Sequence, residues 1–183
     1  MEFKKFRIAG LVIIEPDVFG DERGFFLETY NKERFFQNDI KANFVQDNHS
    51  RSSQNVLRGL HFQRSPFAQA KLVRVIQGEV FDVAVDLREG SKTFGDYQAV
   101  NLSADNKKMF FIPRGFAHGF LTLSETADFC YKVDNYYNKE AEGGIIWNDS
   151  HIAIDWPIIK GVQLSAKDQQ WPRLEEIENK LQW

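Results

Sequence analysis

Apolar and polar residues alternate in short runs along much of the chain, which is the pattern of β-strands. The clearest example is KLVRVIQGEVFDVAVDL at 71–87, where two runs flank a Gln-Gly-Glu turn at 77–79. In the second run, apolar residues alternate with polar or small ones: Phe81, Val83, Val85 and Leu87 against Asp82, Ala84 and Asp86. This pattern predicts a β-hairpin with one face toward a core and one face toward water.

Similar short runs recur at intervals typical of a β-sandwich or β-barrel. They are LVIIEP (11–16), GFFLETY (24–30), DYQAVNLS (96–103), KMFFIP (108–113), HGFLTLS (118–124) and ADFCYKVD (127–134). Helical patterns occur only near 31–38 and at 173–182, where Leu174, Ile177 and Leu181 share one face. We therefore expect an all-β protein, a β-barrel or jelly roll with short peripheral helices.

Composition favours one packed domain of 183 residues, since 43% are apolar and 14% aromatic. We expect a jelly-roll core at roughly 20–150 and a C-terminal helical segment at 165–183. The net charge of −3 provides no basic field for nucleic acid or an anionic membrane, so a phosphate would be held by a few local cations. The N-terminus lacks the apolar core of a signal peptide and no run is long enough to cross a membrane, which favours the cytoplasm.

The stretch RGLHFQ at 58–63 contains the first candidate for chemistry. Strand alternation places His61 on the face opposite its apolar neighbours, and Gly59 permits a β-bulge that would aim Arg58 at the same cavity. His61 is therefore either a hydrogen-bonded core histidine or, with Arg58, part of a site for proton transfer on an anionic substrate.

A metal site is a poor fit to these residues. Metal-binding cupin barrels use an HxH pair, a carboxylate and a later histidine, and PRGFAHGF at 113–120 supplies the later one as His118. His61, however, is followed by Phe62 and Gln63, and the chain has a single cysteine. Acid–base chemistry without a metal is the better interpretation.

Three further residues each allow a structural and a functional interpretation. Asp168 in LSAKD could belong to a capping box with Ser165, or it could contact His61 and fix its tautomer. Tyr131 could be a core aromatic or a general acid. Lys71, which shares a strand face with valines, could extend its ammonium group to water or face a developing oxyanion.

Two polar segments, GDERGFFLETY (20–30) and FVQDNHSRS (44–52), have the composition of solvated, turn-rich loops. Alternatively, their polar side chains could line the mouth of a pocket. The side chains concerned are Arg23, Glu28, Gln46 and Asn48.

Taken together, the motifs resemble the dTDP-4-dehydrorhamnose 3,5-epimerase family across nearly the whole chain. They are FGDERGFFLET, FVQDNHSRSSQNVLRGLHFQ, KLVRVIQGEVFDVAVDLR, FIPRGFAHGF, YKVDNYYNKEAEGGIIWND and LSAKD. The resemblance implies a cupin-type jelly-roll homodimer without metal or organic cofactor, acting on a dTDP-4-keto-6-deoxyhexose in deoxysugar (dTDP-L-rhamnose) biosynthesis.

The resemblance also implies a role for each matched residue. His61 is the proton-abstracting base, Asp168 its partner and Tyr131 the proton donor. Lys71 falls on a substrate-contact position, where its charge could also stabilise the enolate oxygen. Tyr137 stacks on bound substrate. The other implied substrate contacts are Arg23, Glu28, Gln46, Asp47, Asn48, Arg58, His118 and Glu142.

These residue types suit the chemistry, because a C4 ketone acidifies the hydrogens at C3 and C5, and inversion needs an acid and a base on opposite faces of the sugar. Two other possibilities stay open. The barrel could epimerise one carbon or move the keto group between C3 and C4, or it could be a non-catalytic module that binds nucleotide sugars.

Overall fold

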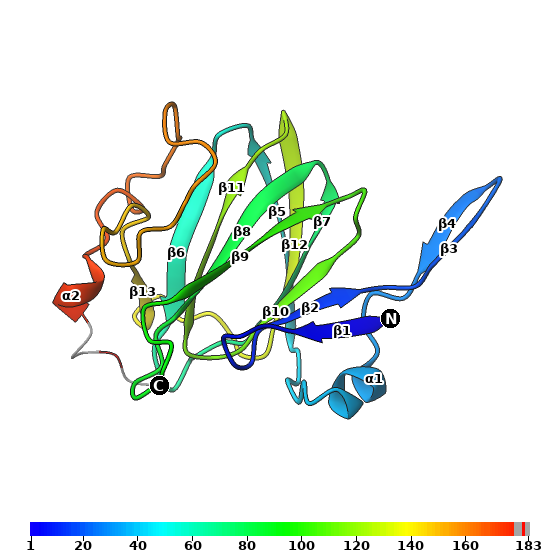
Figure 1. Ribbon diagram of the computed structural model, residues 1–183, viewed down its shortest axis with the longest axis horizontal. Helices are drawn as coiled ribbons and strands as arrows, with labels where there is room; N and C mark the ends of the chain where they lie inside the picture. The colour runs from blue at the N-terminus through cyan, green and yellow to red at the C-terminus, as the bar shows by residue number, and fades with distance from the viewer. Residues whose placement is uncertain (178–180, 182–183) are drawn as a thin grey trace.

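The computed structural model describes residues 1–177 and 181, and its regular structure consists mainly of antiparallel strands (Figure 1). The elements are β1 (Glu2–Lys5), β2 (Val12–Glu15), β3 (Val18–Asp21), β4 (Gly24–Leu27), α1 (Lys32–Gln37), β5 (Gln46–Ser53), β6 (Leu57–Gln63), β7 (Lys71–Gln77), β8 (Glu79–Asp86), β9 (Tyr97–Ser103), β10 (Met109–Ile112), β11 (Phe116–Thr122), β12 (Thr126–Val133), β13 (Glu142–Gly144) and α2 (Leu174–Ile177). The expectation of an all-β chain with short peripheral helices is confirmed.

Two sheets enclose the core. One has six strands in the order β1-β2-β10-β7-β12-β5, and the other has five in the order β13-β6-β11-β8-β9. Side chains from both sheets meet between them, for example Val73 and Phe129 from the first with Ala84 and Phe120 from the second. The third sheet is the β3–β4 hairpin, which projects away from the barrel as a separate arm (Figure 1).

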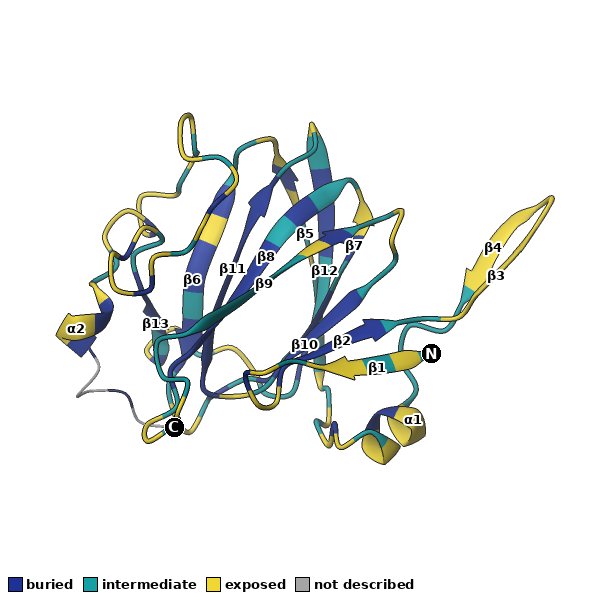
Figure 2. Ribbon diagram, in the orientation of Figure 1, coloured by how far each residue is buried: buried dark blue, intermediate teal, exposed yellow. Residues whose placement is uncertain are grey.

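Smaller layers cover the outer faces of both sheets. The C-terminal segment places Ile152, Trp156 and Leu174 over the five-stranded sheet. Phe35 of α1 packs with Leu72 against the six-stranded sheet, and the Asn31 side chain caps the start of this helix. As Figure 2 shows, the barrel strands are therefore largely buried, whereas the arm and most of α1 are exposed.

The prediction of a water-exposed face for the second strand of the 71–87 hairpin is wrong. The side of β8 that carries Asp82 and Asp86 faces the space between the sheets, and both aspartates have no exposed surface. The opposite face of β8 is also buried, because the C-terminal segment packs on it. Each buried carboxylate has partners nearby, as buried polar groups require.

The interpretation of 44–52 as a turn-rich loop is also wrong, since most of it forms β5, which pairs with β12 over its whole length. The helix expected near 31–38 is found as α1. In the segment expected to be helical at 173–182, Leu174–Ile177 form α2, and 178–180 and 182 lie outside the described residues. Among the described residues, no helix has the length and apolar character needed to cross a membrane. A cytoplasmic location stays a prediction.

Candidate active site

A cavity of about 680 Å³ opens between the two sheets and is closed on one side by the segment 163–168. It gathers six of the residues singled out from the sequence. They are Arg58, His61, Lys71, His118, Tyr131 and Asp168.

His61 and Asp168, which are 107 positions apart in the chain, are in direct contact. The distance from His61 Nε2 to Asp168 Oδ1 is 2.5 Å, and the aspartate is only 3% exposed. Burial acts to raise the pKa of Asp168, but hydrogen bonds led by that from His61 outweigh it and hold this pKa below its usual range. Ser165 Oγ also accepts the Asp168 backbone N–H at 3.1 Å, but 166–169 form a turn and not the start of a helix, so the contact with His61 is the interpretation that holds. The result is an ionised carboxylate beside an imidazole.

The predicted β-bulge at Gly59 is present. The β6–β11 register shifts between His118 and Phe120, and Gly59 has a φ of +140°. A Cβ on Gly59 would lie 2.5 Å from the Cα of Gly119, so only glycine fits this close approach of the two strands. The shift lets Arg58 and His61 line the same cavity.

A second imidazole lies beside the first, because His118 is the cross-strand partner of His61. Its Nε2 is 2.9 Å from Asp82 Oδ2, and burial lowers the pKa of His118 although Asp82 opposes the shift. Asp82 was missed by the sequence analysis. The signal available was a polar residue within a strand of valines, which was interpreted as exposure.

Lys71 and Tyr131 come from the six-stranded sheet and face the histidines across the cavity. Burial lowers the pKa of Lys71 to about 8, while Asp82 and Glu142 act in the opposite direction. Burial raises the pKa of Tyr131, so its phenol keeps its proton through the neutral range. The site therefore has an imidazole on one wall and a phenol on the other.

Tyr137, Glu142 and Lys167 form a polar chain beside the cavity. Tyr137 Oη donates to Glu142 Oε2 at 3.1 Å, and Lys167 Nζ donates to Glu142 Oε1 at 2.6 Å. Lys167 lines the cavity itself and was missed by the sequence analysis, although it directly precedes Asp168. It adds a cation to the pocket wall.

The remaining expected contacts on the barrel lie at the start of β5. Gln46 Nε2 donates to Asn48 Oδ1 at 2.8 Å, and Asp47 Oδ1 accepts from Lys132 Nζ at 2.7 Å. Asp47 and Asn48 line a second cavity of about 330 Å³, and Tyr131 contributes to both cavities. Among the described residues, no three His, Cys, Asp or Glu side chains are placed to hold a metal ion together.

The dTDP-4-dehydrorhamnose 3,5-epimerase family model matches residues 5–176. The chain belongs to this family. It is 58% identical to dTDP-4-dehydrorhamnose 3,5-epimerase of Salmonella typhimurium over 173 residues, and the matched region covers 94% of each chain. It is also 57% identical to that of Escherichia coli over 93% of this chain and 92% of that protein.

A solved member of the 3,5-epimerase family has closely similar architecture. The dTDP-6-deoxy-D-glucose-3,5-epimerase of Legionella pneumophila, crystallised with dTDP-4-keto-L-rhamnose, matches with a TM-score of 0.95 and 51% identity, covering 99% of this chain and 97% of that one. The cupin-like jelly-roll fold and the family resemblance stated from the motifs are thus confirmed.

Two residues that the 3,5-epimerase family resemblance implied as substrate contacts lie away from the cavity. Arg23 lies at the tip of the β3–β4 arm, where its side chain is 85% exposed and pairs with Asp21 at 2.6 Å. Glu28 follows the arm and accepts from Asn31 Nδ2 at 3.1 Å. Neither is among the described residues that line the cavity around His61, and the same is true of Gln46, Asp47, Asn48, Tyr137 and Glu142, which lie on or beside the barrel.

Proposed function

We propose that this chain is a dTDP-4-dehydrorhamnose 3,5-epimerase that inverts C3 and C5 of dTDP-4-dehydro-6-deoxyglucose. The observation that carries this proposal is the placement of a His61–Asp168 pair and a Tyr131 phenol on opposite walls of one cavity. An enzyme that inverts a carbon must remove a proton from one face and return one to the other. A site built only for binding has no need of this pair.

His61 is the base in this mechanism. Because Nε2 contacts Asp168, Nδ1 is the nitrogen that takes the proton from the carbon next to the ketone. The C–H electron pair moves into the ring and the C4 oxygen becomes an enolate oxygen. The ionised Asp168 stabilises the imidazolium that forms.

Tyr131 and Lys71 complete the reaction. The Lys71 ammonium group stabilises the enolate oxygen, and Tyr131 donates a proton to the opposite face of the same carbon. The ketone is restored and the carbon is inverted. His61 then releases its proton to water and Tyr131 takes one from water, which returns both side chains to their starting states. The overall change is an isomerisation that consumes no oxidant, reductant or co-substrate, so the reaction needs no cofactor.

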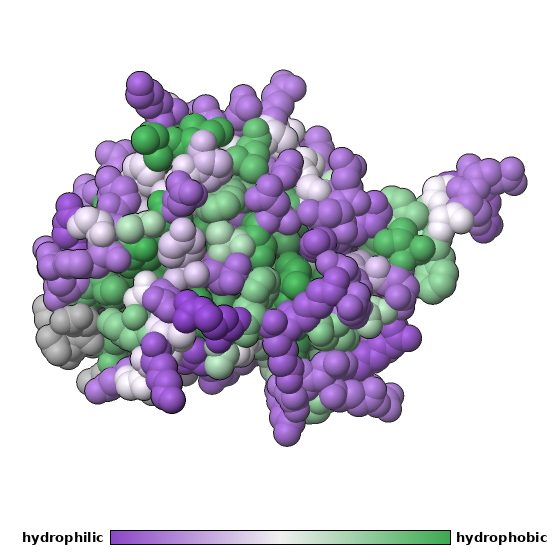
Figure 3. Space-filling model, in the orientation of Figure 1, coloured by the Kyte–Doolittle hydropathy of each residue, from purple (hydrophilic) through white to green (hydrophobic). Residues whose placement is uncertain are grey.

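We also propose that the protein works as a homodimer in which each arm reaches the partner's site. Val18, Phe19, Phe25 and Phe26 of the arm are 46–69% exposed, and Figure 3 shows this apolar surface projecting from the barrel. Apolar surface of this kind is typical of an interface. The arrangement would bring Arg23 of one subunit to the diphosphate beside Arg58 of the other, which accounts for its distance from its own cavity.

The test is proton NMR in D₂O of the purified protein with dTDP-4-keto-6-deoxyglucose. We expect enzyme-dependent deuterium at both C3 and C5. Exchange at one carbon would indicate a mono-epimerase, migration of the keto group a 3,4-ketoisomerase, and binding without exchange a non-catalytic module. Each of these outcomes would overturn the assignment.

The matched pair of variants is His61→Asn and His151→Asn. We expect His61→Asn to lower turnover by about 100-fold or more with an unchanged circular dichroism spectrum, because the base is lost. His151 is exposed and lies 3.6 Å from Glu175, so its substitution should leave turnover unchanged. Full activity of His61→Asn would remove His61 from the mechanism.

A further inference from the structure

Trp171 contacts both members of the His61–Asp168 pair from outside the cavity. Its Nε1 donates to Asp168 Oδ1 at 3.3 Å, the same oxygen that contacts His61 Nε2. Its ring meets the His61 imidazole edge-on, with centroids 6.1 Å apart and planes at 67°. Trp171 is not among the described residues that line the cavity, so its contacts with the pair come from outside that space.

Gly144 leaves the space that the Trp171 indole occupies. In the β13–β6 pairing Gly144 is directly opposite His61, where a side chain would lie beside the imidazole. A Cβ at Gly144 would come within 2.4–2.6 Å of three indole atoms, so glycine leaves room for the ring. Just beyond the indole, Ile146 N–H donates to Pro172 O at 2.9 Å and ties this segment to the strand. The indole thus occupies the position of a cross-strand neighbour of His61.

We infer that Trp171 is a positioning residue of the pair, which orients the Asp168 carboxylate through its N–H and the His61 ring through packing. This inference rests on the proposed function, since it assigns the indole to the same proton transfer. An N–H bond to an anionic oxygen draws charge from it and favours the ionised carboxylate. Burial raises the pKa of Asp168, and Trp171 is one of the hydrogen-bond donors that together overcome this effect.

The charge on Asp168 Oδ1 determines in which direction loss of the Trp171 N–H shifts proton release from the His61–Asp168 pair. Without the indole N–H, that oxygen carries more negative charge and stabilises the imidazolium more strongly, so the pair keeps its proton to higher pH. The other groups facing the pair stay in place in such a variant. They are Arg58, Lys71, His118 and Lys167 around the cavity, with Asp82 and Glu142 behind them.

The variant that tests this is Trp171→Phe, which keeps an aromatic ring and removes the N–H. We expect kcat to fall by about threefold to tenfold with KM unchanged, and the acidic limb of the pH–rate profile to move up by about half to one pH unit. Gly144→Ala, which displaces the indole from the other side, should move the limb in the same direction. If both variants leave the limb where it is in the unchanged protein, the inference is wrong.

The matched control is Trp156→Phe. Trp156 Nε1 also donates a hydrogen bond, to Trp147 O at 2.9 Å, but this indole packs over the outer face of the five-stranded sheet. Its substitution should lower thermal stability without moving the limb. A purely structural role for Trp171 would give the same result as this control.

A measurement without substrate separates this inference from the proposed function. The Asp168 carboxyl carbon signal, followed by NMR against pH in the unchanged protein and in Trp171→Phe, should show an upward shift of the titration midpoint, because the indole N–H is one of the donors that lower this pKa. If the chain fails to exchange C3 and C5 but the midpoint still moves, the proposed function fails while the coupling stands. If the enzyme is active but the titration midpoint is the same in Trp171→Phe, the role given to Trp171 is wrong and the proposed function still stands.

Discussion

Lys71 is a site residue whose charge changes within the pH range of an ordinary activity assay. Burial lowers its pKa from an ordinary value of 10.5 to about 8, so it is an ammonium group at pH 7 and loses its proton as pH rises through 8. If this ammonium holds the enolate oxygen, kcat/KM should fall as pH rises through about 8. Tyr131 does not account for such a limb, because burial moves its pKa above 10.

Two variants check this assignment against pH–rate profiles from pH 6 to 10. Lys71→Met should lower kcat/KM by about 100-fold or more at pH 7, as the loss of an oxyanion donor does. Lys71→Arg should be slower than the unchanged enzyme but should lose its alkaline limb, since a guanidinium stays charged in this range. An alkaline limb that persists in Lys71→Arg would assign it to another group.

Single residues differed in how far the sequence could identify them. His61 was recognisable because alternation placed it opposite its apolar neighbours, and Gly59 allowed the bulge that aims Arg58. The contact between His61 and Asp168 was not derivable from spacing, since a contact across 107 positions depends on how the C-terminal segment packs. Lys167 and Trp171 were missed for the same reason.

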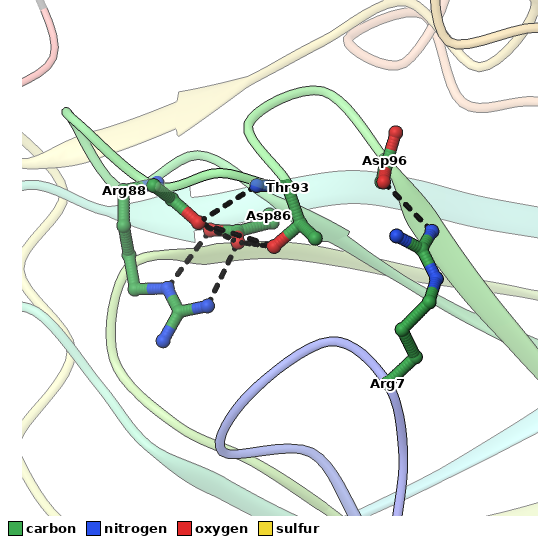
Figure 4. A network of polar contacts seen from close by, with 6 residues as sticks. Arg7, Asp86, Arg88, Thr93 and Asp96 are labelled. Atoms are coloured by element: carbon green, nitrogen blue, oxygen red, sulfur yellow. Dashed lines mark hydrogen bonds and ion pairs between the residues drawn. The ribbon is translucent and has the colours of Figure 1, made fainter.

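At the scale of elements, the turn from β8 to β9 depends on the buried Asp86 carboxylate (Figure 4). It accepts from Arg88 Nε at 2.8 Å and from Ser91 Oγ and Thr93 Oγ1, both at 2.7 Å. Burial raises the pKa of Asp86, but these bonds outweigh it and lower this pKa to about 2. Asp86→Asn should therefore lower the free energy of unfolding by about 2 kcal/mol at pH 7, as measured by urea denaturation.

The pH dependence gives a second readout for Asp86. Its folded pKa is below its unfolded value, so the stabilisation is present above about pH 4 and is lost as pH falls toward 2. The difference between the unchanged protein and Asp86→Asn should shrink over that range. The control is Asp96→Asn, which removes the exposed Arg7–Asp96 pair at 2.8 Å and should cost less than about 1 kcal/mol. Equal costs for both variants would contradict the role given to Asp86.

Strand β8 shows why the sequence predicted the strands better than it predicted what packs against them. Alternation located β8, but it could not show that both faces of this strand are covered, one by the C-terminal segment and the other by the six-stranded sheet. Asp82 and Asp86 were therefore expected to face water. β5 was missed because its side chains are polar on both faces, one partly lining the pocket and the other exposed. Its backbone pairing with β12 leaves no hydrophobic signal in the sequence.

At the scale of the whole molecule, the β3–β4 arm predicts that a complete site needs two chains. The unchanged protein should elute with about twice the mass of one chain in gel filtration, and Phe26→Asp should shift it toward the monomer, because the arm would carry a charge into the interface. A monomeric unchanged protein with full activity would contradict this arrangement.

Mixed dimers test whether Arg23 acts across the interface. Arg23→Ala and His61→Asn should each be nearly inactive, but in a heterodimer one site combines an intact His61 with an intact arm from the partner. Random assembly makes half of the dimers mixed, each with one good site of two, so co-expression should restore about a quarter of the activity. Co-expressed His61→Asn and Asp168→Asn are the control and should restore none, because both residues belong to the site of a single chain. Failure of Arg23→Ala to be rescued would show that its effect stays within its own subunit.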